Sequence, residues 1–151
     1  MPSGSYPTIQ SAVNDTNCQI IELSPQNYNE NVVINRSVTV NGSSPATTIV
    51  NGQLLQRVFR IGTSSTVTIT DLTMTNGRGG IYNQGDLYLG NVVIAQNYTE
   101  AGPGIFNVGT VTMISTTVRD NEGQGTQEER LAGGVYNDGQ SILSAASLRT
   151  M

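Results

Sequence analysis

The 151-residue sequence contains no histidine, no lysine and no tryptophan, and it has a single cysteine, Cys18. One cysteine cannot form an internal disulfide, and without histidine it lacks the base that activates a catalytic thiol. We therefore interpret Cys18 as a small buried apolar residue. The longest apolar runs are only four or five residues, far short of a membrane span, so we expect no membrane insertion.

Charge is also scarce. Charged residues make up 12% of the chain, the net charge is −4, and all seven positive charges are arginines. A protein that binds nucleic acid or an anionic membrane normally carries a strong excess of basic residues. The charge balance therefore argues against both partners. Glycine, serine, threonine and asparagine are abundant instead, and alternating apolar residues indicate that the chain folds.

A repeat accounts for that alternation. The stretch GGIYNQGDLYLGNVVIAQN covers 79–97, a related stretch covers 104–121, and a third begins at residue 134. Aligned on Gly85, Gly109 and Gly139, each unit has two alternating apolar pairs separated by a polar or small residue. Period-two alternation predicts short strands, and the residue between the pairs predicts a corner. Each unit would then be one coil whose apolar side faces a shared core.

The sequence thus predicts an all-β fold, a right-handed parallel β-helix of about five coils in one domain, 1–151. Residues 1–18 would form an N-terminal cap with a short helix containing Ile9 and Val13, and 19–151 would form the coils. The C-terminal end is predicted to lack a cap, and the 141–151 segment could then bind a second copy. The side chains predicted to be buried are Leu87, Leu89, Val92, Ile94, Val111, Met113 and Val118.

Stacked coils would also align polar residues. Asn83, Asn107 and Asn137 occupy equivalent positions, and we predict a hydrogen-bonded asparagine ladder there. Tyr82, Phe106 and Tyr136 would form the adjacent column. The length differences between units all fall between the end of one unit and the start of the next. We therefore expect the variable loops to leave from one corner, where solenoids often bind partners.

The segment from Tyr6 to Gly52 resembles the N-terminal part of pectin-lyase-like right-handed β-helix proteins. The repeat units are similar to those of bacterial surface and autotransporter-like β-helices. This resemblance implies the fold but no single function, because one coil type supports lyases, hydrolases, adhesins and passive stalks. The motifs that the resemblance associates with catalysis, such as paired aspartates, basic proton acceptors and histidine motifs, are missing. We therefore predict no enzyme activity, no catalytic residues, no metal and no cofactor.

The sequence favours a non-catalytic structural or adhesin-like module. The alternative is a carbohydrate-binding module or a degenerate polysaccharide lyase or hydrolase, with polysaccharide as the partner. Ice binding is disfavoured because the threonine rows are interrupted. The residues proposed for surface binding are Tyr88, Tyr98, Glu100, Glu122, Glu128, Glu129 and Arg130.

Location has two possible interpretations. The first residues, MPSGSYPTIQ, lack the basic and apolar segments of a signal peptide, so the protein is either intracellular or a mature domain that Met1 begins. The composition is typical of secreted surface proteins, and we expect an extracellular or cell-surface location. Four Asn-x-Ser/Thr sequons, at Asn14, Asn35, Asn41 and Asn97, are expected by chance in such a chain, and we infer no glycosylation from them.

Overall fold

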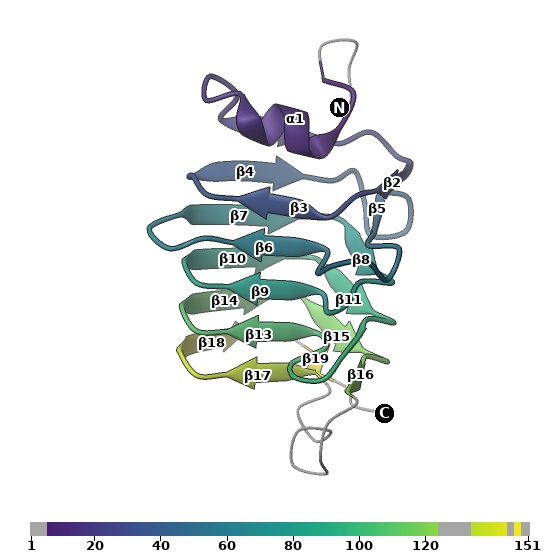
Figure 1. Cartoon of the computed structure of the whole chain (residues 1–151), viewed down its shortest axis with the longest axis vertical. Coiled ribbons are helices and arrows are strands. Elements are labelled where there is room, and N and C mark those ends of the chain that lie inside the picture. Colours follow the sequence, from purple (N-terminus) through teal and green to yellow (C-terminus); the bar gives the residue numbers. More distant parts are fainter. Residues whose placement is uncertain (1–5, 124–133, 145–146, 149–151) are drawn as a thin grey trace.

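The computed structural model describes residues 6–123, 134–144 and 147–148. It is an all-β solenoid of about four turns, with one short helix near the N-terminus, whereas the sequence predicted about five coils. The chain winds in a right-handed sense, and successive coils stack along the long axis (Figure 1). The predicted fold class is confirmed.

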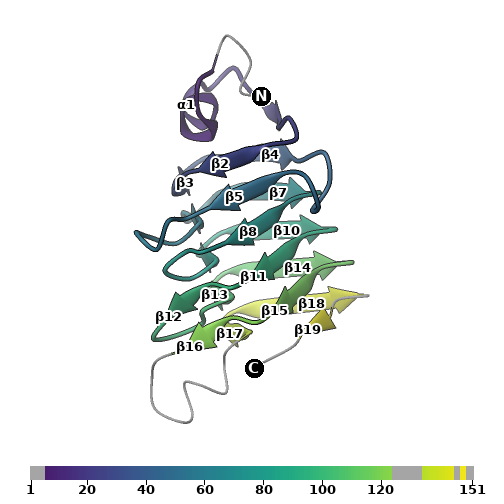
Figure 2. The same ribbon diagram turned by 90° about the vertical axis from the view of Figure 1, so that its right-hand side faces the viewer.

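Three parallel sheets form the sides of the solenoid. The first sheet contains β1 (Ile20–Glu22), β4 (Val38–Asn41), β7 (Thr66–Thr70), β10 (Asp86–Gly90), β14 (Thr110–Ile114) and β18 (Gln140–Ser144). The second contains β2 (Asn27–Asn29), β5 (Ile49–Asn51), β8 (Thr73–Thr75), β11 (Val93–Ala95), β15 (Thr117–Arg119) and β19 (Ser147–Leu148). The third contains β3 (Val32–Ile34), β6 (Phe59–Ile61), β9 (Ile81–Asn83), β13 (Ile105–Asn107) and β17 (Val135–Asn137). A fourth, two-stranded sheet pairs β12 (Tyr98–Thr99) with β16 (Glu122–Gly123) at one corner (Figure 2).

The strand register follows the repeat alignment. Leu87 pairs with Val67 on one side and Val111 on the other, and Ile94 pairs with Met74 and Val118. The seven apolar side chains predicted to be buried lie in the core, including Leu89 and Met113. Strands β2 and β5 were not predicted, because in each only the central residue, Tyr28 or Val50, is buried and no alternation is visible.

At the corners between the first and second sheets, one residue in each of three coils has a left-handed backbone conformation. Asp71, Asn91 and Ser115 follow β7, β10 and β14 and have φ values of 58°, 51° and 49°. These are the positions where the alternation of each unit breaks, and short polar residues tolerate this conformation better than bulky ones. The corner lets the next strand direct its apolar side chain to the same core.

The glycines on which the repeat units align are required because the backbones of neighbouring coils approach each other closely there. A Cβ on Gly109 would lie 2.2 Å from the carbonyl oxygen of Gly85, and one on Gly139 would lie 2.0 Å from that of Gly109. Any other residue would force neighbouring coils apart at this position.

The predicted N-terminal helix is α1 (Ile9–Asn14), with Thr8 as its N-cap. Carboxylate oxygens of Glu30 accept hydrogen bonds from the backbone N–H groups of Ile9 and Gln10. The guanidinium of Arg36 donates to the carbonyls of Ala12, Val13, Asp15 and Cys18. Helix α1 covers the N-terminal end of the coils, and Ile9, Ala12 and Val13 belong to the core. The predicted uncapped end, 141–151, falls partly outside the described residues and stays a prediction.

Candidate binding surface on the third sheet

One column of outward side chains runs along the third sheet. Its strands have three residues each, and in β3, β6, β9 and β13 the flanking residues point into the core. The middle residue therefore points outward in each strand. The register places these middle residues side by side, in the order Val33, Arg60, Tyr82, Phe106 and Tyr136.

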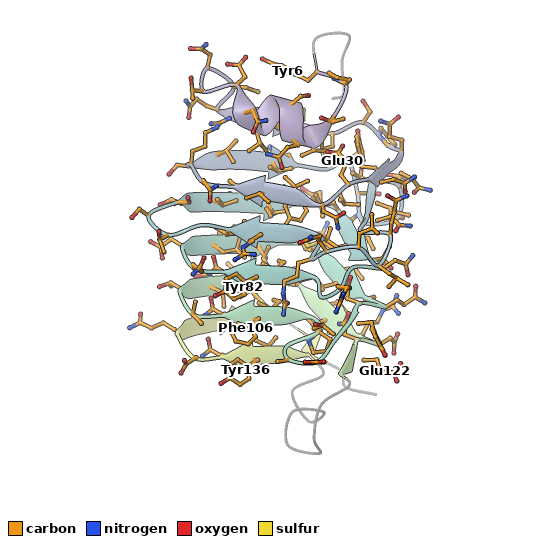
Figure 3. All side chains as sticks on the ribbon, viewed as in Figure 1. Tyr6, Glu30, Tyr82, Phe106, Glu122 and Tyr136 are labelled. Atoms are coloured by element: carbon orange, nitrogen blue, oxygen red, sulfur yellow. The ribbon has the colours of Figure 1, made fainter. Side chains whose placement is uncertain are left out.

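Three of these residues form an aromatic ladder, Tyr82, Phe106 and Tyr136 (Figure 3). The ring centroids of Tyr82 and Phe106 are 5.4 Å apart, and those of Phe106 and Tyr136 are 4.7 Å apart. The ring planes of Tyr82 and Phe106 are tilted by 31°, and those of Phe106 and Tyr136 are stacked with an angle of 24° between them. Such stacking stabilises the contact between coils by about 0.5–1.5 kcal/mol per pair beyond burial.

Arginines continue the ladder toward the N-terminus. The Cζ atom of Arg60 lies 5.2 Å from the ring centroid of Tyr82, and that of Arg57 lies 5.9 Å from the same ring and 5.7 Å from that of Phe106. These are cation–π distances. The Tyr82 ring therefore holds two guanidinium groups at a fixed place on the surface.

Arg57 also attaches a loop. Its Nη1 donates to the carbonyls of Ile81 and Gly102, and its Nη2 donates to the carbonyl of Ala101. The pKa of Arg57 is lowered to about 10, mainly by burial; Tyr82 opposes this shift and the nearby positive charge of Arg60 adds to it. The group remains protonated at neutral pH, so a half-buried cation is fixed against backbone oxygens.

A cavity of about 850 Å³ opens beside this column. It is lined by the segments 31–33, 55–57 and 99–101 and by Arg60, Arg78, Tyr82 and Phe106. Three arginines border it, Arg57, Arg60 and Arg78, together with one carboxylate, Glu100. Among the residues that the structure describes, the ion pair found is Arg119–Asp120, and none of the cavity arginines lies within ion-pair distance of a carboxylate.

The residues proposed from the sequence are mostly dispersed. Tyr88 is 37% exposed on β10 of the first sheet, where its stacked neighbours are Thr68 and Thr112, as predicted. Tyr98 lies in β12 of the two-stranded corner sheet, so the two tyrosines belong to different sheets and form no shared platform. Glu122 begins β16, and Glu128, Glu129 and Arg130 lie outside the described residues. Glu100 is the proposed residue that the described structure brings to the cavity.

The predicted asparagine ladder is confirmed. Asn83 Nδ2 donates to Asn107 Oδ1, and Asn107 Nδ2 donates to Asn137 Oδ1, both over 2.7 Å. A second, buried pair was missed: Asn97 Nδ2 donates to Asn121 Oδ1 over 3.0 Å, and Asn97 Oδ1 accepts from the backbone N–H of Gly77. Its signal was the 24-residue spacing between Asn97 and Asn121, which equals that between Leu87 and Val111.

Sequence reasoning also missed the cavity arginines. The alignment of VFRI at 58–61 with GIYN at 80–83 already placed Arg60 in the column of Tyr82, and that alignment could have found it. Arg57 and Arg78 lie in irregular segments outside the repeat pattern, so no periodicity marks them.

Among residues 6–123 and the described C-terminal segments, no group of three or more histidine, cysteine, aspartate or glutamate side chains could hold a metal ion. Within the same residues, the helix is too short and polar to cross a membrane. Comparisons of the chain with protein-family models, curated proteins and solved structures give no match.

Proposed function

We propose that this chain is a non-catalytic β-solenoid module that acts as a structural scaffold or adhesin-like element outside the cell or on its surface. The observation that carries the proposal is the set of side-chain ladders that join consecutive coils in register. The N-terminal segment from Tyr6 to Gly52 favours the pectin-lyase-like class, and the GGIYNQG-type units favour β-helices of the bacterial surface and autotransporter-like type.

The ladders suit a load-bearing rod because each coil is bonded to the next by its side chains as well as its backbone. The asparagine ladder supplies buried hydrogen bonds at one corner, and the aromatic ladder supplies stacked rings on the adjacent sheet. The coils that contain β9, β13 and β17 cannot separate from one another without breaking both sets of contacts. The scaffold role therefore has a physical basis that is independent of any ligand.

Single-molecule stretching tests the load-bearing role. With handles attached near Tyr6 and Asn137, we expect a distinct unfolding force, and we expect the Asn107→Ala variant to unfold at a lower force. Extension at negligible force in the parent chain would contradict a scaffold function.

A parallel assay on pectate and polygalacturonate, with and without calcium, should release no unsaturated or reducing ends. Release that disappears when one carboxylate is mutated would show an enzyme instead.

Carbohydrate binding, including that of a degenerate polysaccharide lyase or hydrolase, is the second candidate. It is favoured by the cavity, which is lined by two rings of the aromatic ladder, Tyr82 and Phe106. Tyr136, 40% exposed at the end of the ladder, offers the most accessible of these rings. Retention of the protein on an immobilised neutral polysaccharide, weakened by Tyr136→Ala and unchanged by Tyr88→Ala, would support this candidate. Equal retention of both variants would contradict it at this surface.

A further inference from the structure

The cavity of the third sheet concentrates positive charge in an acidic protein. The chain carries a net charge of −4, yet three of its seven arginines border this one cavity. Against the three arginines stands Glu100, so the described lining has three positive charges and one negative, a net charge of +2. The other described arginines are engaged elsewhere, Arg36 with helix carbonyls and Arg119 with Asp120.

The donors at this cavity are free to bind a ligand. The guanidinium groups of Arg60 and Arg78 make no hydrogen bond or ion pair with the part of the chain that the structure describes, and both side chains are exposed. Each guanidinium has five N–H donors in one plane, and a parallel pair of them can bind two oxygens of one oxyanion. The Tyr82 ring holds the Arg60 group in place, so little side-chain freedom would be lost on binding.

Arg57 adds a positive charge to the same cavity, and hydrogen bonds to backbone carbonyls fix its position. Its guanidinium is anchored by the carbonyls of Ile81, Ala101 and Gly102, which leave its charge without a carboxylate partner. The attraction between a half-buried cation and an anion is screened less than it would be in bulk water. The lowered pKa of Arg57 is consistent with this lack of compensation, because an adjacent carboxylate would raise it.

We propose that this cavity is an oxyanion-binding site, in which Arg60 and Arg78 bind a sulfate or carboxylate group and Arg57 supplies a fixed positive charge behind it. The site takes either a small free anion or the anionic substituent of a larger glycan. It does not depend on the scaffold function, because the guanidinium groups of Arg57, Arg60 and Arg78 make none of the amide or ring–ring contacts of the two ladders.

Calorimetric titration at constant ionic strength tests the site with three probes: sodium sulfate, dextran sulfate and uncharged dextran of the same length. We expect saturable binding of sulfate, of dextran sulfate or of both, and at least about tenfold weaker binding by the Arg60→Gln/Arg78→Gln variant. Binding of free sulfate would identify a small anion as sufficient. Binding of dextran sulfate alone would identify a glycan-borne group.

Two controls separate the site from general charge effects. The single variants Arg60→Gln and Arg119→Gln each remove one positive charge; Arg60→Gln should weaken binding, and Arg119→Gln, which lies outside the cavity, should leave it unchanged. Circular dichroism should show that the variants keep their strand content. Equal binding of dextran and dextran sulfate, equal loss in Arg119→Gln and Arg60→Gln, or no binding of any probe would overturn the proposal. Failure here would leave the stretching result, and with it the scaffold proposal, unaffected.

Discussion

The side-chain amide of Asn83 donates to that of Asn107 one coil further along, over 2.7 Å, and both side chains are fully buried. Asn107 in turn donates to Asn137 and to the carbonyls of Gly109 and Gln140. Replacing Asn107 by alanine removes donors and an acceptor from a buried network, so we expect it to lower the free energy of unfolding by about 2–3 kcal/mol.

Urea unfolding of Asn107→Ala measures this loss. The matched control is Asn137→Ala, which changes the same residue type at the exposed end of the ladder and should cost less than about 1 kcal/mol. Equal destabilisation by the two substitutions would contradict a ladder in which burial determines the contribution.

Leu89 and Tyr88 test which face of β10 is buried. Leu89 is fully buried between Ile69 and Met113, and Tyr88 points outward. Leu89→Asp places a charge without a partner in the core, and we expect loss of the folded state, a cost above about 4 kcal/mol. Tyr88→Asp should remain folded. Circular dichroism distinguishes the two outcomes, and a folded Leu89→Asp variant would contradict the structure.

Arg57 should contribute to stability through the loop that it attaches. Arg57→Met keeps most of the apolar stem but removes the donors to Ile81, Ala101 and Gly102, so we expect a loss of about 1–3 kcal/mol. Arg78→Met, at an exposed side chain, should cost less than about 0.5 kcal/mol. Thermal denaturation compares the two, and an Arg57→Met variant as stable as Arg78→Met would show that the attachment adds nothing.

The N-terminal cap should weaken at both extremes of pH. The hydroxyl of Tyr6 donates to the carboxylate of Asp15, which raises the pKa of Tyr6 to about 12 and lowers the pKa of Asp15. The Tyr6 contribution is complete below the ordinary tyrosine pKa of about 10 and is lost as pH rises through about 12. The Asp15 contribution is complete above its ordinary value near 3.8 and is lost as pH falls through the lowered pKa.

Melting temperatures of the parent chain and Tyr6→Phe, measured from pH 2 to pH 12, test this coupling. Their difference should be constant between about pH 5 and pH 9 and should shrink outside that range. A difference that stays constant into strong acid and strong base would contradict the Tyr6–Asp15 interaction.

Self-association through residues 141–151 stays a prediction from the sequence. An exposed strand edge is a template for another chain, so light scattering should show a mass that rises with concentration. A monomer at high concentration, with 141–151 protected from hydrogen exchange, would exclude it. The chain truncated after Asp138 is the control, because it removes the proposed interface.

The sequence was sufficient for the architecture because each coil repeats one local rule. Alternation fixed the inward residues, as Leu87 and Leu89 show, and the break at Asn91 marked a left-handed corner. The site was harder to predict because only Arg60 and the aromatic column follow the repeat, whereas the other two arginines do not. Arg57 and Arg78 come from irregular segments, and their meeting at one cavity depends on the loop geometry at 55–57 and 99–101.

Arg57 stands just before β6, and the carbonyls of Ala101 and Gly102 stand just before β13, so the bonds between them pass over the coil that begins with β9. Most of the side-chain contacts, such as those of the asparagine ladder, join adjacent coils. With such contacts alone, a solenoid could unfold one coil at a time from either end. The hydrogen bonds from Arg57 to Ala101 and Gly102 join coils that are not adjacent, so these coils and the one between them cannot unfold one at a time. The three coils from β6 to β15 should therefore open together as one unit of hydrogen exchange, while the coils outside them fray independently.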